Sequence, residues 1–305
     1  MSAPWHGLLL LNKKSGLTSF DSLKEVKKAF ATGKAGHTGT LDKFASGLLL
    51  VLVGRGVKLA PLFENCTKEY TGTVRFGAET DTLDPEGTVI AQGAIPSREE
   101  IEAVLPAFRG NILQAPPAYS AIHINGRRAH ELVRDGQQPE MKQRPVTIYS
   151  LELISWEAPD AIIQVRCSAG TYIRSLARDL AIAAGSRASL TALTRTRVGA
   201  FRLEDAAPPD GEEGLVNALR PLDRKLFEAL SLPYFLIDDK AAEDFVHGRV
   251  LKSILASSIA EGPREKDAQA AGVFRKTAPG EGDTLLGVLA RKNGEWAYGH
   301  VFADS

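Results

Sequence analysis

One stretch, residues 36–47 with the sequence GHTGTLDKFASG, constrains the fold of this chain more than any other. It contains three glycines, three hydroxyl side chains, one imidazole and the carboxylate of Asp42. Glycine permits tight bends and close backbone approach, and the apolar run at 48–53 that follows is typical of a buried strand. The pattern predicts that Asp42 lies on a tight loop anchored to the core, where a reactive side chain is held rigidly. An ordinary turn aspartate is the alternative interpretation of this loop taken alone.

Length and composition indicate a globular protein. The 305 residues suffice for one large domain and a small one, and 44% of them are hydrophobic. No apolar run approaches the roughly 18–20 residues that span a bilayer, and the first residues lack a secretory signal pattern. We therefore expect a cytoplasmic protein without a membrane partner. The two cysteines, Cys66 and Cys167, fit a reducing compartment and indicate no metal site.

The net charge is zero, but the charges are unevenly distributed. Residues 166–202 carry seven arginines and one acid, whereas residues 204–245 carry eleven acids and four bases. The arginine-rich segment could meet phosphates. A solvated surface with scattered ion pairs is the alternative.

Periodicity predicts both strands and helices. Strands are expected near 7–11, 70–76, 146–157 and 161–168, and a C-terminal hairpin around Asn293-Gly294. Helices are expected near 20–30, after a capping box at Ser97, and from about 171 to 185. By composition, residues 208–214 are predicted to be a linker and residues 256–283 to be mobile.

Two long motifs, some hundred and thirty residues apart, resemble those of the tRNA pseudouridine-55 synthases, the TruB family. The first is GHTGTLD at 36–42, and the second is RCSAGTYIRSL at 166–176. Shorter matches are KKSGLTS at 13–19, KEY at 68–70 and the acidic turn at 81–87. The chain departs from the usual motif directly after Asp42, where Lys43, Phe44 and Ser46 replace proline, leucine and threonine. In a separate motif, His123 replaces a lysine.

The resemblance implies roles for particular residues. It makes Asp42 the nucleophile, Arg174 its ion-pair partner and Tyr70 the ring that stacks on the target base. His37 would fill the space that the flipped base leaves, or alternatively stabilise the loop. The other substrate or RNA contacts implied are Lys13, Tyr172, Leu193, Arg195, Arg127, Arg128 and Arg144.

The resemblance also implies the architecture. We expect an α+β pseudouridine-synthase fold with a mixed, largely antiparallel sheet over residues 1–228. An insertion at about 118–145 would form a thumb that clamps RNA. Residues 229–305 would form a small β-rich, PUA-like RNA-binding domain, a weaker match than the catalytic region.

The expected function is isomerisation of uridine 55 in the T-loop of tRNA, by base flipping and an aspartate-dependent rearrangement. Whether Asp42 attacks sugar or base, or assists elimination, stays open. The expected protein is a monomer that binds the tRNA T-arm and uses no metal or small-molecule cofactor. Two other classes remain: an RNA-binding protein without activity, and a hydrolase, which would need a second carboxylate.

Overall fold

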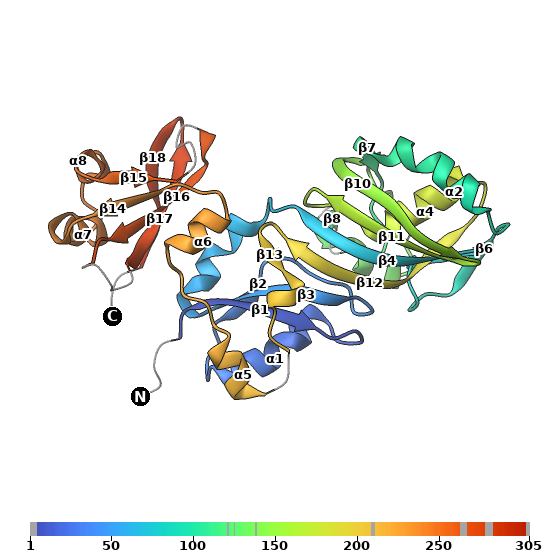
Figure 1. Ribbon diagram of the computed structural model, residues 1–305, viewed down its shortest axis with the longest axis horizontal. Coiled ribbons are helices and arrows are strands. Elements are labelled where there is room, and N and C mark those ends of the chain that lie inside the picture. Colours follow the sequence, from blue (N-terminus) through green and yellow to red (C-terminus); the bar gives the residue numbers. More distant parts are fainter. Residues whose placement is uncertain are drawn as a thin grey trace.

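The computed structural model describes residues 5–120, 122–124, 126–137, 139–208, 211–262, 267–277 and 283–302. Figure 1 shows a long twisted sheet with helices packed on it and a separate, smaller sheet formed by the C-terminal residues. None of the helices in these ranges is both long enough and apolar enough to cross a bilayer.

Nine strands of the described residues form the large sheet, with the main order β1-β3-β12-β4-β11-β10-β7, while β2 pairs with β3 and β13 with β12. The β3–β12 pairing is parallel and the others are antiparallel, which confirms the predicted mixed, largely antiparallel sheet. The strands are β1 (Gly7–Lys13), β2 (Ala35–His37), β3 (Ser46–Val53), β4 (Lys68–Phe76), β7 (Gly110–Gln114), β10 (Arg144–Glu157), β11 (Asp160–Cys167), β12 (Ala188–Val198) and β13 (Phe201–Arg202).

The two ends of this sheet differ in burial, and the sequence explains why. In β3 the even-numbered leucines pack into one apolar cluster, and Leu49, Val51 and Val53 pack into another. A strand covered on both faces reads as a continuous apolar run. In β4 and β11, buried and more exposed residues alternate, because only one face of these strands packs on the core.

Helices cover the sheet on either side of the Asp42 loop. α1 (Ser19–Ala29) begins at a capping box formed by Thr18 and Asp21, and α2 (Arg98–Val104) begins at the predicted box of Ser97 and Glu100. The other elements of this part are η1 (Gly54–Phe63), β5 (Ala78–Thr80), β6 (Val89–Gln92), η2 (Leu105–Phe108), β8 (His123–Ile124), β9 (Arg127–Arg128), α3 (Ala129–Arg134), α4 (Ile173–Ala183), η3 (Leu203–Asp205), α5 (Glu212–Asn217) and α6 (Arg224–Ala229).

The predicted linker at 208–214 is partly wrong. Helix α5 begins at Glu212, and an ion pair of 2.9 Å joins this residue to Lys28 of α1. Acidic and proline-rich composition indicated a loop, but Leu215 of the same helix is buried in the core beside α1. Residues 209 and 210 of the predicted linker lie outside the described residues.

The C-terminal residues form a five-stranded sheet with the order β15-β14-β16-β17-β18. Its elements are β14 (Tyr234–Ile237), α7 (Asp239–Val246), α8 (Leu251–Ala256), β15 (Ile259–Glu261), β16 (Ala270–Arg275), β17 (Thr284–Lys292) and β18 (Glu295–Val301). The predicted hairpin around Asn293-Gly294 is confirmed as β17–β18. The prediction of a mobile 256–283 is wrong for 259–261, which form the edge strand β15, and for 270–275, which form the middle strand of this sheet. Residues 263–266 and 278–282 lie outside the described residues.

The two sheets share one apolar core. Phe227 of α6 meets Phe274 of β16 edge to face with ring centroids 5.3 Å apart, and both rings are completely buried. The same cluster contains Leu10 and Leu50 of the large sheet. The C-terminal sheet is therefore fixed to the rest of the molecule by core packing.

Candidate active site

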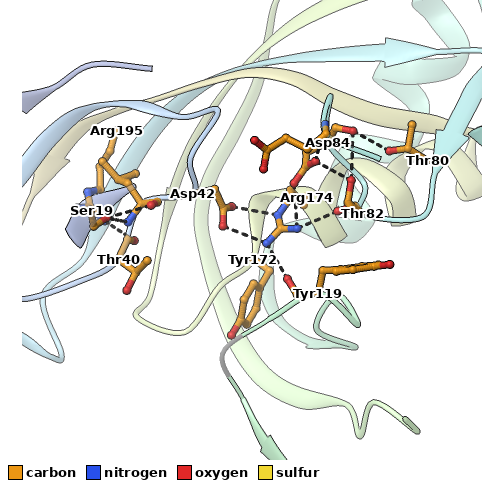
Figure 2. Close-up of polar contacts among 12 residues, drawn as sticks. Ser19, Thr40, Asp42, Thr80, Thr82, Asp84, Tyr119, Tyr172, Arg174 and Arg195 are labelled. Atoms are coloured by element: carbon orange, nitrogen blue, oxygen red, sulfur yellow. Dashed lines mark hydrogen bonds and ion pairs between the residues drawn. The ribbon is translucent and has the colours of Figure 1, made fainter. Parts of the chain in front are cut away.

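The Asp42 loop connects β2 to β3 and is tied down from several directions. The Ser19 hydroxyl of α1 donates to the carbonyl of Leu41 and accepts from its N–H, at 3.0 and 2.8 Å. Arg195 donates to the carbonyls of Gly39 and Thr40 at 3.1 and 3.2 Å. These contacts fix the backbone directly before Asp42 (Figure 2).

The turn after β1 holds the backbone that follows Asp42. Lys13 is completely buried, and its Nζ donates to the carbonyls of Lys14, Leu17 and Lys43. The N–H of Gly16 also donates to the Lys43 carbonyl, at 2.8 Å. The Asp42 carboxylate is thus presented on a loop whose neighbours on both sides are restrained.

Gly47 ends this loop where a side chain would not fit. Its φ is +100°, and an added Cβ would lie 2.4 Å from the Arg195 carbonyl oxygen. The close approach allows the parallel pairing of β3 with β12, in which Gly47 is the partner of Arg195. This glycine therefore joins the Asp42 loop to the strand that carries Arg195.

Arg174, in the first turn of α4, brings the two long motifs together. Its Nη2 donates to Asp42 Oδ1 at 3.1 Å, and its Nε lies 3.0 Å from Oδ2 in an ion pair. The Arg174 side chain is 5% exposed and that of Asp42 is 37% exposed. The guanidinium is therefore buried behind a carboxylate that solvent can still reach. Figure 2 shows the two groups facing each other.

A second carboxylate, Asp84, contacts the other side of this guanidinium. Arg174 Nη1 lies 3.2 Å from Asp84 Oδ2 and donates to the Thr82 carbonyl at 2.8 Å. Asp84 Oδ1 accepts from the Thr82 hydroxyl and the Glu86 N–H, and its side chain is 7% exposed. Arg174 is thus oriented by Asp84 from behind while it faces Asp42, and the acidic turn between β5 and β6 supplies that support.

Burial and charge act in opposite directions on the Asp42 carboxyl. Burial raises the pKa of Asp42, and the adjacent Arg174 guanidinium opposes this rise, as does Lys13. Desolvation penalises the charged form, whereas a nearby cation favours it. For Lys13, burial lowers the pKa to about 8, and the negative charge of Asp42 only partly offsets that effect.

Tyr70, Leu193 and His37 lie in the shell around the loop. Tyr70 of β4 and Leu193 of β12 belong to the same apolar cluster as Leu41, and burial raises the pKa of the Tyr70 hydroxyl. The pKa of His37 is lowered by burial and by Arg195, so its imidazole is neutral at pH 7. Its Nδ1 is buried without a hydrogen-bond partner.

Tyr172 precedes α4, and Gln114 fixes its backbone. The Gln114 amide accepts from the Tyr172 N–H at 2.8 Å and donates to the Tyr172 carbonyl at 3.1 Å. The position of α4, and with it of Arg174, is thereby coupled to the edge strand β7. Gln114 and Asp84 are the two supporting residues that sequence reasoning missed. Asp84 had a signal in the acidic-turn motif, but Gln114 had none beyond its place before a proline pair.

Of the remaining predicted RNA contacts, Arg127, Arg128 and Arg144 lie in the insertion at 118–145, and Arg195 lies in β12. Arg127 and Arg128 are exposed on β9, where Arg127 pairs with Asp135. Arg144, His123 and Lys142 line a cavity of about 210 Å³ together with Glu140 and apolar side chains. Arg195 is 3% exposed and donates to the carbonyls of Gly39, Thr40 and Leu48, so it holds the motif loop. It also forms a side-chain hydrogen bond with Tyr70, which opposes the rise that burial causes in the pKa of the Tyr70 hydroxyl. Residues 121, 125 and 138 lie outside the described residues.

A comparison with protein families places the N-terminal half of the chain in a known family. Residues 27–173 match the sequence profile described as "TruB family pseudouridylate synthase (N terminal domain)". The matched region contains the Asp42 loop, Tyr70 and the acidic turn and ends just before Arg174.

Curated proteins provide similar sequences. A tRNA pseudouridine synthase B of Borreliella burgdorferi (strain ZS7) is 47% identical over 204 residues, which cover 66% of this chain and 72% of that protein. One from Chromohalobacter salexigens is 39% identical over 287 residues, covering 91% and 92%. One from Treponema denticola is 39% identical, covering 79% and 82%.

Solved structures give the same fold. A chain in the crystal structure of a Cbf5-Nop10-Gar1 complex superposes with a TM-score of 0.68 at 24% identity, covering 98% of this chain and 84% of that one. A chain of an archaeal box H/ACA sRNP Nop10-Cbf5 complex gives 0.66 at 23% identity, covering 93% and 78%. At these identities the likeness concerns the fold.

Proposed function

This chain belongs to the TruB family of pseudouridine synthases, and we propose from this that it isomerises uridine 55 in the T-loop of tRNA. The observation that carries the proposal is the contact of Arg174 with Asp42, because it assembles the two long motifs into one charged site. The curated relatives named tRNA pseudouridine synthase B support tRNA as the substrate.

The reaction makes modest demands on the protein. The N1–C1′ bond of uridine breaks, the base turns, and C5 bonds to C1′; C5 loses a proton and N1 gains one, so the product is an isomer. Attack on the sugar, attack on the base and assisted elimination all require an ionised carboxylate. Arg174 favours the ionised form of Asp42 and fixes its direction.

The target base must leave the stacked T-loop to reach Asp42. We assign Tyr70 to stacking on the flipped uracil, with Leu193 beside it, because both belong to the apolar cluster that contains Leu41. His37 is neutral and has an unpaired buried Nδ1, which suits a residue that fills space vacated by a base. Lys13, Arg195 and Tyr172 serve mainly to position these groups.

The more distant cations complete the RNA contacts in this proposal. Arg127, Arg128 and Arg144 lie on the insertion, which we assign as the thumb over the T-arm. The domain boundary falls near 228, and the C-terminal sheet is a PUA-like RNA-binding domain that acts with the catalytic part in a monomer. No metal or other cofactor enters the proposed reaction.

The hydrolase alternative needs a second carboxyl group that can act as an acid on the substrate. Asp84 is the second carboxylate of the site. Its oxygens accept from Arg174, Thr82 and the Glu86 N–H, and its side chain is almost completely buried. It is therefore engaged in orienting Arg174. This arrangement favours isomerisation over hydrolysis.

The test uses a T-arm hairpin with tritium at C5 of uridine 55 only. Turnover releases tritium to water, and nucleoside chromatography of a digested unlabelled hairpin shows pseudouridine with the mass of uridine. Asp42→Asn should abolish release and retain RNA affinity, whereas the surface variant Asp160→Asn should behave as wild type. Free uracil would indicate the hydrolase, bound but unchanged RNA would indicate a binding protein, and a hairpin labelled at another loop uridine tests the position.

A further inference from the structure

One face of the large sheet is open where β10, β11, β4 and β12 lie side by side. On the other face, Val74, Val165 and Leu190 pack into the core that contains Leu176 of α4. On the open face, Gln164 and Arg166 of β11 are exposed, and Thr71 and Thr194 lie opposite each other in β4 and β12. The arginines at the end of this face take no part in the site described above.

Two of these arginines share one carboxylate across three strands. In the sheet register, Glu69 of β4 lies between Arg166 of β11 and Arg197 of β12. A guanidinium nitrogen from each arginine lies 3.7 Å from Glu69 Oε1. The side chains of Arg166 and Arg197 are 53% and 37% exposed, so two cations face solvent with one anion between them.

An exposed aromatic ring extends this row. Tyr149 of β10 is 52% exposed, and the Arg166 guanidinium carbon lies 5.4 Å from its ring centroid. Stacking on an aromatic face restricts a guanidinium while it leaves N–H groups available to an anion. Arg166 is thus held in a defined position on an open surface.

A third arginine on the same face, Arg75, is fully paired with a carboxylate. Arg75 donates to both oxygens of Asp160, at 2.9 and 2.7 Å, so this pair is neutral and its donors toward Asp160 are used. The Arg166–Glu69–Arg197 row carries two cations and one anion, and both contacts to the Glu69 carboxylate are long, although Arg197 Nε also donates to the Gly199 carbonyl at 2.8 Å. Charge complementarity therefore favours a polyanion at this row and not at Arg75.

The row lies directly behind the active site. Glu69 precedes Tyr70 in β4 and therefore lies on the opposite face. In β12 an irregularity between Arg195 and Arg197 places Arg195 beside Tyr70 on the face that carries the site, and Arg197 beside Glu69 on the other face. Figure 1 shows the start of β4 and the β12–β13 end on the side of the large sheet toward the C-terminal sheet. An RNA held at Asp42 could reach the row only with a segment that crosses this end of the sheet to the opposite face.

We propose that Arg166 and Arg197, with Tyr149 aligning Arg166, bind the phosphate backbone of a tRNA segment outside the T-arm. This inference rests on the proposed function, since it takes tRNA as the partner. The row binds backbone charge and adds no sequence preference, because guanidinium–phosphate contacts carry no direct base information.

The test compares a full-length tRNA transcript with the isolated T-arm hairpin. Arg166→Gln and Arg197→Gln should each raise the Kd for full-length tRNA roughly three- to tenfold and make its logarithmic salt dependence shallower by about one unit. Kd for the hairpin and kcat on the hairpin should stay at wild-type values. Arg75→Gln on the same face is the matched control and should change neither RNA.

Removal of the shared carboxylate should have the opposite effect on affinity. Glu69→Gln removes the shared anion and should tighten binding of full-length tRNA while leaving the hairpin unaffected. Unchanged affinity of the double variant Arg166→Gln/Arg197→Gln for full-length tRNA overturns the inference, as does an equal loss on the hairpin. Failure of the wild-type protein to form pseudouridine would instead count against the proposed function, and the binding comparison of the two RNAs would still decide the role of the row.

Discussion

Arg174 meets Asp42 along one edge of its guanidinium, with Nη2 donating to Oδ1 at 3.1 Å and Nε 3.0 Å from Oδ2, while Nη1 lies 3.2 Å from Asp84. One planar group therefore connects two carboxylates that come from different loops. A point charge on a flexible stem cannot reproduce this arrangement, because it lacks the rigid fork of donors.

Arg174→Lys should accordingly lower kcat on the hairpin by roughly a hundredfold or more, in line with the removal of a preorganised donor. Binding of the hairpin should change little, because the guanidinium is buried behind Asp42. Single-turnover rates and hairpin Kd measure the two effects separately. Arg178→Lys, in the next turn of α4, is the matched control; a normal rate for Arg174→Lys would show that the fork is dispensable.

The pH dependence of turnover should follow Asp42. In the proposed reaction the carboxylate is the active form, and burial raises its pKa above the usual 3.8, so activity should be lost on acidification at a higher pH than a free aspartate would give. Arg174 works against this rise. Arg174→Gln should therefore shift the acid limb of kcat further toward neutral pH, and an acid limb at the same pH in both proteins would contradict the pairing.

Lys13 should make the free energy of unfolding depend on pH in the alkaline range. Its pKa is lowered from 10.5 to about 8 in the folded protein, so between these values the unfolded chain holds the proton and the folded chain does not. Stability then rises with pH over that window. Lys13→Met should remove roughly 2 to 3 kcal/mol of the rise between pH 8 and 10.

Urea unfolding of wild type and Lys13→Met at both pH values measures this difference. Taking the difference between the two proteins cancels the other groups that titrate in this range. Parallel pH profiles would show that Lys13 keeps its proton to an ordinary alkaline pH in the folded protein.

Several of these relationships were predictable from the sequence, and others were not. The contact between Asp42 and Arg174 was predicted by the resemblance of two long motifs to those of the TruB family, and the structure confirms that contact. The inward orientation of Arg195 did not follow, because a sequence shows that a segment is rich in arginine but not which arginine faces the core. Asp84 resembled an ordinary turn residue until its oxygens were found on Arg174 and Thr82.

The largest difference concerned β16, where small residues suggested mobility. Gly272 lies at the centre of this strand, and an added Cβ would come within 2.9 Å of the Phe227 ring. A small residue is therefore required by tight packing there. Composition cannot distinguish a glycine that frees the chain from one that admits a neighbouring ring.

Lys43 stands where the family usually has proline, and its ion pair with Glu86 is a feature that the sequence did not predict. The 2.8 Å contact joins the Asp42 loop to the turn that carries Asp84, and both side chains are about half exposed. Such a pair contributes less than about 1 kcal/mol to stability. Its effect should appear in the alignment of Asp42.

Lys43→Glu and Glu86→Lys should each lower kcat several-fold with little change in melting temperature, and the double charge reversal should recover most of the loss. A double variant that is no better than the singles would exclude the pair as a positioning contact. High salt should reduce the difference between wild type and the single variants, since it screens exposed charges.

Phe274 should stabilise both sheets at once. Phe274→Ala removes a completely buried ring that packs on Phe227 and should cost about 3 to 5 kcal/mol. Phe20→Ala is the control, because that ring is 65% exposed. Urea unfolding followed by circular dichroism should show one transition displaced as a whole; two transitions, with that of the large sheet unmoved, would contradict a shared core. A chain ending near residue 230 should be destabilised for the same reason.

The shared core sets the distance between two surfaces of the molecule. One surface is the loop that presents Asp42, and the other is the C-terminal sheet. The packing of Phe227 on Phe274 is part of the core that joins them. A partner that contacts both surfaces must match the distance that this packing sets between them. Selection of RNA by overall shape would then require no reading of bases away from the target loop.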